Sequence, residues 1–233
     1  MNEMYHQRAT EYAKVIKDNV YNALYDRPSL LSLVNHQQFN SCLDMGCGPG
    51  AYLLDLKKIC NQITAIDLSS EFIKMVSKDY PDIKSYVCDL NEGLKEEKDN
   101  SFDLVISPLT IHYIKDFDKL FSEVARVLQP QGTFAFSTHH PFLDFQDSQS
   151  GNYFETEYLT QMWNTLGNET EVSFYRRPLS QTLNSLFKTG FIVDGFSEGS
   201  PSEEINKISP NQYKRLTTKP QFIFVKAKKI KSN

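Results

Sequence analysis

A glycine-rich stretch is the part of this 233-residue chain whose residue types and spacing point most directly to ligand binding. It spans Leu43–Gly50 and reads Leu-Asp-Met-Gly-Cys-Gly-Pro-Gly, overlapping the end of the apolar run Ser41–Met45. Glycine tolerates positive φ angles and, because it lacks a Cβ, lets a ligand approach the backbone closely. In an open parallel sheet, ligands bind beyond the carboxyl ends of the strands. The stretch therefore predicts a cofactor site at the end of a first strand.

Two further acidic residues end the next two apolar runs. Asp67 comes roughly twenty residues after the glycines, where a carboxylate can accept hydrogen bonds from both hydroxyls of a ribose. Asp89 ends the third run, where an acid and its neighbouring backbone can bind the amino group of an adenine. Together with Asp44, these acids would lie at or near three adjacent strand ends. Because all three fall in register with the glycines, we expect a cofactor that contains adenosine.

Apolar strands and amphipathic helices alternate along the chain, which is typical of βαβ units with a parallel sheet. The expected fold class is α/β: a doubly wound, mostly parallel seven-stranded sheet with helices on both faces and an antiparallel last strand. The strands are expected at Ser41–Met45, Ile63–Asp67, Ile83–Cys88, Phe102–Ser107, Thr133–Ser137, Phe191–Ser197 and Gln221–Ala227. The helices are expected at 3–20, Ser29–Asn35, Ala51–Cys60, Ser70–Lys78, 118–128 and Ser180–Thr189.

The regular alternation breaks after the fifth strand, where residues 138–178 form a long aromatic and polar insertion. Within it we expect a hairpin that pairs Tyr153–Glu157 with Glu171–Arg176, and after the sixth strand a loop to about Pro220. The whole chain, 1–233, is expected to be one domain. Its parts would be an N-terminal helical cap at 1–40, a cofactor-binding core at 41–137, a substrate lid at 138–178 and the C-terminal part of the sheet at 179–233.

On these residues the chain resembles the class I S-adenosylmethionine-dependent methyltransferases, particularly the small-molecule and ubiquinone-pathway-like members of the type 11 group. The resemblance covers roughly residues 41–137. Its matching segments are Leu43–Gly50 for the first motif, Ile66–Ser69 for the ribose motif, Cys88–Leu90 for the adenine motif, Phe102–Ser107 for the fourth strand, and Val127–Gly132 for a Leu-x-Pro-Gly-Gly turn in which Gln131 replaces the first glycine.

The resemblance implies S-adenosyl-L-methionine as the cofactor and methyl transfer as the reaction. The glycines that match the family's first motif are Gly46, Gly48 and Gly50, which would wall the methionyl and ribosyl parts of the cofactor. Asp44 would orient the turn and meet the amino group of the cofactor directly or through water.

The same resemblance assigns residues to the nucleoside and sulfonium parts of the cofactor. Asp67 would bind the ribose, and Leu68 would pack on the adenine. Asp89 and Leu90 would hold the adenine edge, and Ser107 would lie beneath the sulfonium.

Aromatic side chains are expected to close the site from two sides. In family members the N-terminal helix often closes over the cofactor, which makes Tyr12 and Tyr21 candidates, although ordinary packing would account for them equally well. From the insertion, Tyr153 is a candidate for contacting the substrate and Arg177 for binding an anionic group on it. Packing of the lid against the core remains the alternative for both.

Histidines at strand ends are the candidates for acid–base chemistry. Methyl transfer from a sulfonium is an in-line displacement, in which the protein supplies positioning, desolvation and, for some acceptors, a base. Histidine, with an ordinary pKa of about 6.5, suits proton removal at neutral pH. We expect His140 first, then His112, as this base, while a loop histidine bonded to the backbone is the alternative. Neither a metal nor a covalent nucleophile is expected.

Composition narrows the class of protein further. Hydrophobic residues make up 40% and charged residues 23% of the chain, as in a globular protein rather than a disordered or membrane-embedded one. The N-terminus is polar and lacks a secretory signal, so we expect a cytoplasmic protein with no membrane partner. The four cysteines include no CxxC pair and are expected to be buried as small apolar residues.

The expected partner is a small-molecule methyl acceptor, and other functions stay open. The Gly46-x-Gly48-x-x-Ala51 pattern also fits an NAD-dependent oxidoreductase, and a protein that binds S-adenosylmethionine without catalysis is a further alternative. An RNA methyltransferase is another, because residues 201–233 hold eight Lys and Arg against two Glu. The net charge of −4 and the lack of an Asn-Pro-Pro-Tyr motif argue against nucleic acid. The sequence makes no prediction of the oligomeric state.

Overall fold

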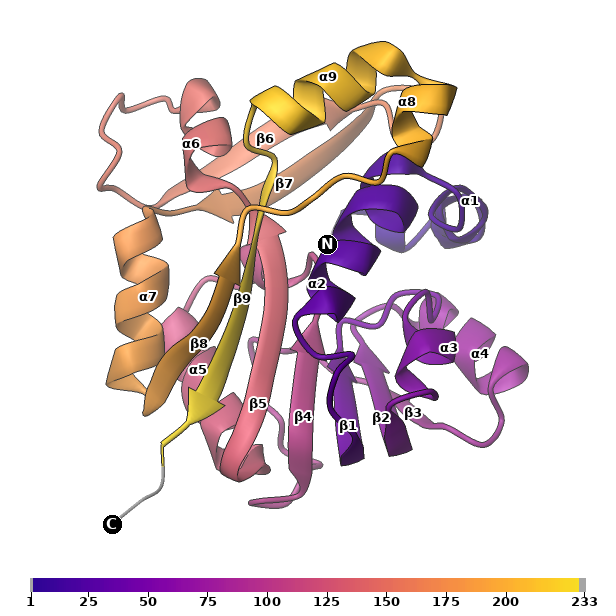
Figure 1. The fold of residues 1–233 in the computed structure, drawn as a ribbon, viewed down its shortest axis with the longest axis vertical. Coiled ribbons are helices and arrows are strands. Elements are labelled where there is room, and N and C mark those ends of the chain that lie inside the picture. Colours follow the sequence, from indigo (N-terminus) through magenta and orange to yellow (C-terminus); the bar gives the residue numbers. More distant parts are fainter. Residues whose placement is uncertain (1, 231–233) are drawn as a thin grey trace.

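The computed structural model describes residues 2–230, which form a seven-stranded sheet with helices on both faces (Figure 1). The strand order is β3-β2-β1-β4-β5-β9-β8. Neighbouring strands from β3 to β5 are parallel, whereas β9 is antiparallel to both β5 and β8. The predicted fold class is therefore confirmed. The strands are β1 Phe39–Met45, β2 Cys60–Asp67, β3 Lys84–Val87, β4 Phe102–Ser107, β5 Leu128–His139, β8 Phe191–Ser197 and β9 Phe222–Lys229.

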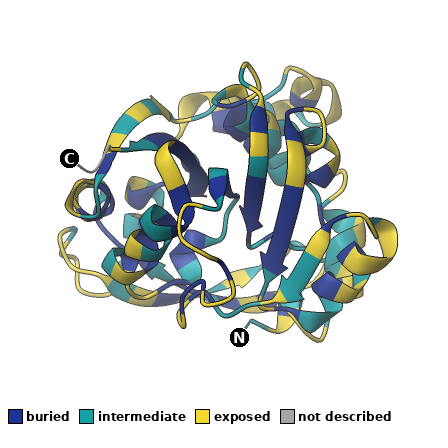
Figure 2. Ribbon diagram, turned by 90° about the horizontal axis from the view of Figure 1, so that it is seen from below, coloured by how far each residue is buried: buried dark blue, intermediate teal, exposed yellow. Residues whose placement is uncertain are grey.

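Each face of the sheet has its own hydrophobic cluster, because successive side chains of a strand point to opposite faces. In β1, Cys42 belongs to one cluster, while Leu43 and Met45 belong to the other. Figure 2 shows long stretches of the central strands coloured as buried. Residues of α3 and α4 join the first cluster, and residues of α5 and α7 join the second. These helices are α3 Leu53–Leu56, α4 Ser70–Asp79, α5 Phe117–Val127 and α7 Leu179–Lys188.

The N-terminal region is broken into short helices, so the prediction of one helix over residues 3–20 is wrong. The side chain of Asn19 accepts hydrogen bonds from the backbone N–H of Tyr21, at 2.8 Å, and of Asn22, at 3.4 Å. Such local side-chain bonding competes with helical bonding at the end of the predicted helix. An earlier break comes at His6 and Arg8, whose φ/ψ angles of −120°/−76° and −107°/21° are not helical. The resulting elements are the 3₁₀ turn η1 Glu3–Tyr5, α1 Ala9–Val15, the π-helical turn η2 Asn22–Asp26 and α2 Arg27–Ser32.

The segment expected as a loop before Pro220 contains two helices, α8 Glu204–Ile208 and α9 Pro210–Thr218. Ser209 caps α9 by accepting a hydrogen bond from the backbone N–H of Gln212, and proline occupies the first helical position. Both helices bury an apolar side chain in the core, Ile205 and Leu216. No helix within residues 2–230 has the length and hydropathy needed to cross a lipid bilayer.

The insertion forms the predicted hairpin, but its first strand starts later than expected. β6 is Glu157–Trp163 and β7 is Thr170–Arg176, and Glu157 pairs with Arg176. Residues 152–155 wrap around the buried Arg176 guanidinium instead, offering it the carbonyls of Asn152, Tyr153 and Glu155. Satisfying this buried cation keeps that segment out of the hairpin. Before it, the insertion forms α6 Pro141–Asp144 and the 3₁₀ turn η4 Phe145–Asp147.

The N-terminal segment and this hairpin pack together, and we refer to residues 2–12 with β6 and β7 as the composite lid. Met4 is fully buried against Leu159 and Phe174 in a small cluster of its own. The Asn2 side chain donates to the carbonyl of Ser173, at 3.1 Å, and accepts from its N–H, at 2.9 Å. The lid is therefore assembled from segments that are far apart in the sequence.

The four cysteines are free thiols, and Cys42, Cys47 and Cys60 are buried, as predicted. Cys88 is half-buried at the end of the third strand.

Candidate functional site

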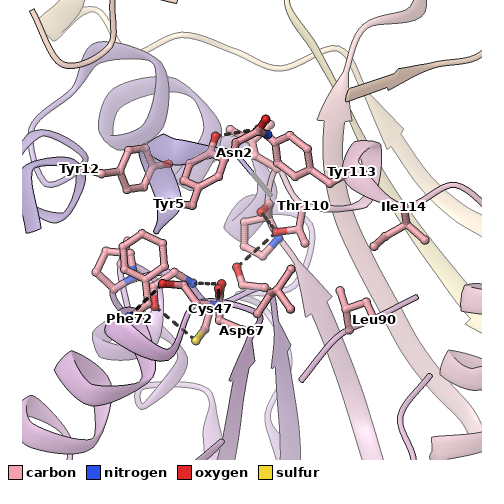
Figure 3. A pocket seen from close by; sticks show the side chains of 18 of the residues that line it. Asn2, Tyr5, Tyr12, Cys47, Asp67, Phe72, Leu90, Thr110, Tyr113 and Ile114 are labelled. Carbon is pink, nitrogen blue, oxygen red and sulfur yellow. Dashed lines mark hydrogen bonds between the residues drawn. The ribbon is translucent and has the colours of Figure 1, made fainter. Parts of the chain in front are cut away.

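A cavity of about 630 Å³ lies above the carboxyl ends of β1, β2 and β4, between the glycine-rich turn and the composite lid (Figure 3). Binding pockets for small molecules span roughly 300–1,000 Å³. The cavity is therefore large enough for a cofactor, and its walls come from the N-terminal segment and the β6–β7 hairpin as well as from the core.

The three glycines of the turn divide into two roles. Gly46 and Gly48 line the cavity, and a Cβ added to Gly48 would meet nothing within 4 Å. Gly50, at a φ of +87°, does not line it, because a Cβ there would lie 2.9 Å from Leu53 and 3.2 Å from Tyr80. Gly48 thus leaves room for a ligand, whereas Gly46 and Gly50 allow close packing, since a Cβ at Gly46 would overlap the Thr110 hydroxyl.

Asp67 lines the cavity at the end of β2 and fixes the glycine-rich turn. One carboxylate oxygen accepts a hydrogen bond from the N–H of Gly48, at 2.9 Å, and the other from the N–H of Ser69, at 2.8 Å. Burial raises the pKa of Asp67, although these backbone N–H groups favour the carboxylate. Each oxygen can accept a further hydrogen bond, so the side chain can still receive hydroxyl groups from a ligand.

The end of β3 provides a second polar edge next to apolar side chains. Asp89, Leu90 and Leu68 all line the cavity, as expected from the sequence. Asp89 accepts hydrogen bonds from the N–H and the side-chain amide of Asn91, at 2.9 and 3.0 Å. Leu68 is 39% exposed and Leu90 is buried, so a flat ring would find apolar contacts beside a carboxylate.

Asp44 and Ser107 lie beneath the turn rather than on the cavity wall. Ser107 is fully buried and donates to the carbonyl of Met45, at 2.8 Å. Asp44 is also fully buried, and neither of its carboxylate oxygens has a hydrogen-bond partner among residues 2–230. Burial, with a smaller contribution from the charge of Asp67, raises the pKa of Asp44 to about 8. Buried polar atoms are normally paired, and because Asp44 does not line the cavity, a ligand there could reach it only through water.

An acid and an arginine that the sequence did not single out also line the cavity. Asp26 is only 2% exposed; one oxygen accepts from the hydroxyl of Tyr52, at 2.6 Å, and the other has no partner within residues 2–230. Burial raises the pKa of Asp26 to about 6. The Nε of the neighbouring Arg27 is likewise buried without a partner in the described chain. No local pattern marks them, since the segment Tyr25–Pro28 reads as a turn.

The N-terminal segment contributes aromatic side chains from above. Tyr12 lines the cavity, with its ring centroid 5.0 Å from that of Tyr5 and 5.8 Å from that of Phe72. The hydroxyls of Tyr5 and Tyr113 are 2.7 Å apart (Figure 3). Tyr21 does not line the cavity and packs on the core beside α2. Of the two tyrosines expected to close over a cofactor, the structure therefore brings only Tyr12 to the cavity.

Neither candidate base lines the cavity. The Nδ1 of His140 accepts from the N–H of Phe142, at 3.2 Å, which caps α6, and its Nε2 lies 2.8 Å from a carboxylate oxygen of Glu198. The ring of His112 is buried, stacks on His139 at 3.9 Å, and its Nδ1 lies 3.3 Å from the Thr138 hydroxyl. Burial, together with His139, keeps the pKa of His112 well below its ordinary value. The geometry supports structural roles for both histidines.

Tyr153 and Arg177 brace the insertion and do not reach the cavity. The Tyr153 hydroxyl accepts from the N–H of Leu179, at 3.0 Å. Arg177 donates to the carbonyls of Ile114, at 2.7 Å, and Lys115, at 3.1 Å, and its guanidinium lies 3.7 Å from the ring centre of Phe117. Burial lowers the pKa of Arg177 to about 10. From this part of the chain, Tyr158, Ser173 and Tyr175 line the cavity instead.

Comparison with known proteins gives consistent results. Residues 43–136 match the family model described as a methyltransferase domain. An uncharacterised protein of Haemophilus influenzae is 24% identical over 90% of this chain and 89% of its own length. A malonyl-[acyl-carrier protein] O-methyltransferase of Salmonella typhimurium is 33% identical over 47% of this chain, which spans only 43% of that enzyme.

Among solved structures, the fold is similar to that of a putative S-adenosylmethionine-dependent methyltransferase from Listeria monocytogenes. The TM-score is 0.73 at 22% identity, over 87% of this chain and 95% of the other. At this identity the likeness shows the fold, and the matched domain is that of a methyltransferase.

Proposed function

We propose that this chain, which belongs to the class I S-adenosylmethionine-dependent methyltransferases of the type 11 group, transfers the methyl group to a small-molecule acceptor bound under the composite lid. One observation supports this proposal above the others. A single cavity joins the glycine-rich turn, Asp67 and Asp89 on one side to side chains of the lid on the other. An acceptor on the lid side would lie beside the cofactor, as in-line transfer requires.

The nucleoside part of the cofactor would be held by the ends of β2 and β3. Asp67 has acceptor capacity left for the ribose hydroxyls, and its existing bonds to the N–H groups of Gly48 and Ser69 hold it in place. Asp89 would face the adenine edge, and the leucines Leu68 and Leu90 would cover the ring.

The amino-acid part of the cofactor would be held by Asp26 and Arg27. A free α-amino acid end carries an ammonium and a carboxylate, and these two side chains offer the opposite charges from adjacent positions on the same wall. Each has a buried polar atom that no other described residue satisfies. A ligand that pairs with both atoms would remove two unsatisfied groups, which are costly to leave buried.

Neither candidate histidine lines the cavity, so we assign no general base to the transfer. When bound, S-adenosylmethionine would supply an electrophilic methyl carbon, to which the lone pair of an acceptor bonds in line while the carbon–sulfur bond breaks and S-adenosylhomocysteine leaves. The chain would contribute orientation and exclusion of water, because Asn2 joins the N-terminal segment of the lid to Ser173 of its hairpin, and Tyr5 joins the lid to Tyr113 above the site. The cytoplasmic location and the division into a cap, a core, a lid and a C-terminal part stay predictions.

Calorimetry with S-adenosylhomocysteine and NADH tests the cofactor part of this proposal against the oxidoreductase alternative. We expect S-adenosylhomocysteine to bind and NADH not to bind; the reverse preference would contradict the proposal. A screen of small acceptors with S-adenosylmethionine, read out as S-adenosylhomocysteine formed, tests catalysis. Methylation of RNA that is lost when the exposed lysines of the basic C-terminal segment, Lys214 and Lys219, are replaced by alanine would favour the RNA methyltransferase alternative instead.

A further inference from the structure

The wall of the cavity that faces away from the glycine-rich turn is built almost wholly of aromatic and apolar side chains. Besides the hydrogen-bonded pair Tyr5 and Tyr113, it includes Ile114 and the tyrosines Tyr158 and Tyr175 of the β6–β7 hairpin. The ring centroids of these last two tyrosines are 4.8 Å apart, and Tyr158 is 60% exposed. The wall therefore offers flat apolar surfaces that continue from the interior to the mouth of the cavity.

The charged residues of the cavity are distributed unevenly. Its carboxylates, Asp26, Asp67 and Asp89, come from η2, the end of β2 and the end of β3, where the cofactor would lie. The lid-facing wall has one charged side chain among the described residues, Lys115, which is exposed and forms no ion pair within residues 2–230. Burial raises the pKa of Tyr5 to about 12, so its phenol is neutral at neutral pH and does not offset the positive charge of Lys115.

The position of Lys115 at the mouth is fixed through the backbone. Arg177 donates hydrogen bonds to the carbonyls of Ile114 and Lys115, which ties this segment to the end of β7, next to Tyr175. Lys115 also borders a shallow surface groove between α5 and α7. Its ammonium group is therefore attached where the aromatic wall meets solvent.

We propose that the methyl acceptor is a small planar carboxylic acid, with its ring against the tyrosines of the lid and its carboxylate facing Lys115. This inference rests on the proposed function, which places the cofactor on the opposite wall of the cavity. An amine of the same shape would bring its charge towards Lys115 and the sulfonium, with no carboxylate on the lid-facing wall to offset the repulsion. A neutral analogue would keep the ring contacts and lose the attraction to Lys115.

Three probes that share a ring and differ in charge test the inference: indole-3-acetate, tryptophol and tryptamine. Each is titrated into the full chain with saturating S-adenosylhomocysteine, and binding is measured by calorimetry. We expect the carboxylate to bind most tightly and the amine most weakly. Preference for the amine, or no binding of any probe at millimolar concentration, would overturn the inference.

Two substitutions separate the contributions of charge and ring. Lys115→Ala should weaken indole-3-acetate binding about two- to fivefold, as for an exposed ion pair, and leave tryptophol unchanged. Lys98→Ala, the control, removes an exposed lysine outside the cavity and should change neither. Tyr158→Ala should weaken both probes about three- to tenfold, because both lose the same aromatic contact.

The affinity for S-adenosylhomocysteine distinguishes failure of the proposed function from failure of the inference about the acceptor. Failure of the unsubstituted chain to bind it would overturn the proposed function. Normal cofactor binding, combined with a Lys115→Ala variant that binds indole-3-acetate as well as before, would overturn only the inference about the acceptor. A Lys115→Ala variant that loses S-adenosylhomocysteine affinity instead would assign Lys115 to the cofactor and would likewise overturn it.

Discussion

On the cofactor side of the cavity, Gly48 and Asp67 come from the ends of two neighbouring parallel strands and are joined through a backbone N–H. On the lid side, Tyr5 and Tyr113 are 108 residues apart in the sequence and meet through their side chains, by a contact between their hydroxyls and an edge-to-face contact of their rings. The first arrangement follows from the sheet itself, whereas the second depends on how the N-terminal segment and the region after β4 pack.

The family match covers Gly48 and Asp67 on the cofactor side and also Tyr113 on the lid side. It ends at residue 136, before the insertion that forms the β6–β7 hairpin begins. Hydrogen bonds to backbone groups at strand ends can persist when side chains elsewhere are replaced. A wall made of side chains can differ between enzymes that bind different acceptors. We therefore expect substitutions on the two sides to act on different measurable quantities.

The largest effect is expected from Asp44→Asn, under the cofactor wall. The pKa of Asp44 is raised to about 8 in the folded chain, from an ordinary 3.8. The folded state therefore holds this proton more firmly than the unfolded state, and the stability it contributes is lost as the pH rises through the folded pKa. Without ligand, the variant should gain stability on the order of several kcal/mol above about pH 8 and little below about pH 4.

Thermal unfolding of the unsubstituted chain and of the Asp44→Asn variant across this pH range measures the effect. The exposed Asp82, substituted in the same way, is the control, and it should not gain stability at alkaline pH. If the stability of the unsubstituted chain and that of Asp44→Asn depend on pH in the same way, burial of the Asp44 carboxylate does not destabilise the fold, and the prediction is wrong.

The next largest effect concerns Asp67 and the cofactor itself. Asp67→Ala should lose two hydrogen bonds to the ribose and weaken S-adenosylhomocysteine binding by roughly 2–3 kcal/mol, as measured by calorimetry. Asp67→Ala should affect binding of indole-3-acetate only indirectly, through packing that the two ligands share. Unaltered cofactor affinity would mean that the ribose assignment is wrong.

A smaller effect is expected from Arg27→Ala, and it tests whether the N-terminal region belongs to the cofactor side. S-adenosylhomocysteine has an amino-acid end, whereas 5′-methylthioadenosine lacks it. Loss of the guanidinium should weaken the first by about 1–2 kcal/mol, because Arg27 is half-buried, and should leave the second unchanged. Arg215→Ala, on α9 and outside the cavity, is the control. Equal losses for both ligands would place Arg27 elsewhere in the cofactor site.

The smallest effect is expected from His140→Ala. This side chain caps α6 and contacts Glu198, so its loss should lower the free energy of unfolding by about 1 kcal/mol, as for other helix caps. Cofactor affinity should stay the same, and His36→Ala, in an exposed position, should change neither quantity. A variant of unchanged stability that no longer transfers methyl groups would restore His140 as a candidate base.

The sequence by itself determined the fold class, the strand Phe191–Ser197 to the residue, and the placement of Gly46, Asp67 and Asp89 at one cavity. These features are local. Periodicity marks each strand, and parallel strands bring their carboxyl ends to the same edge of the sheet, so residues that follow them must meet there.

Only the tertiary structure decided which residues outside the strand ends reach the site. Asp26 and Arg27 arrive there because α2 packs on the core, and Tyr5 because Asn2 is fastened to β7. His140 follows a strand end as the acids do, yet its ring turns away to cap a helix. Side-chain direction after a strand depends on the packing around it, and no spacing in the sequence records that packing.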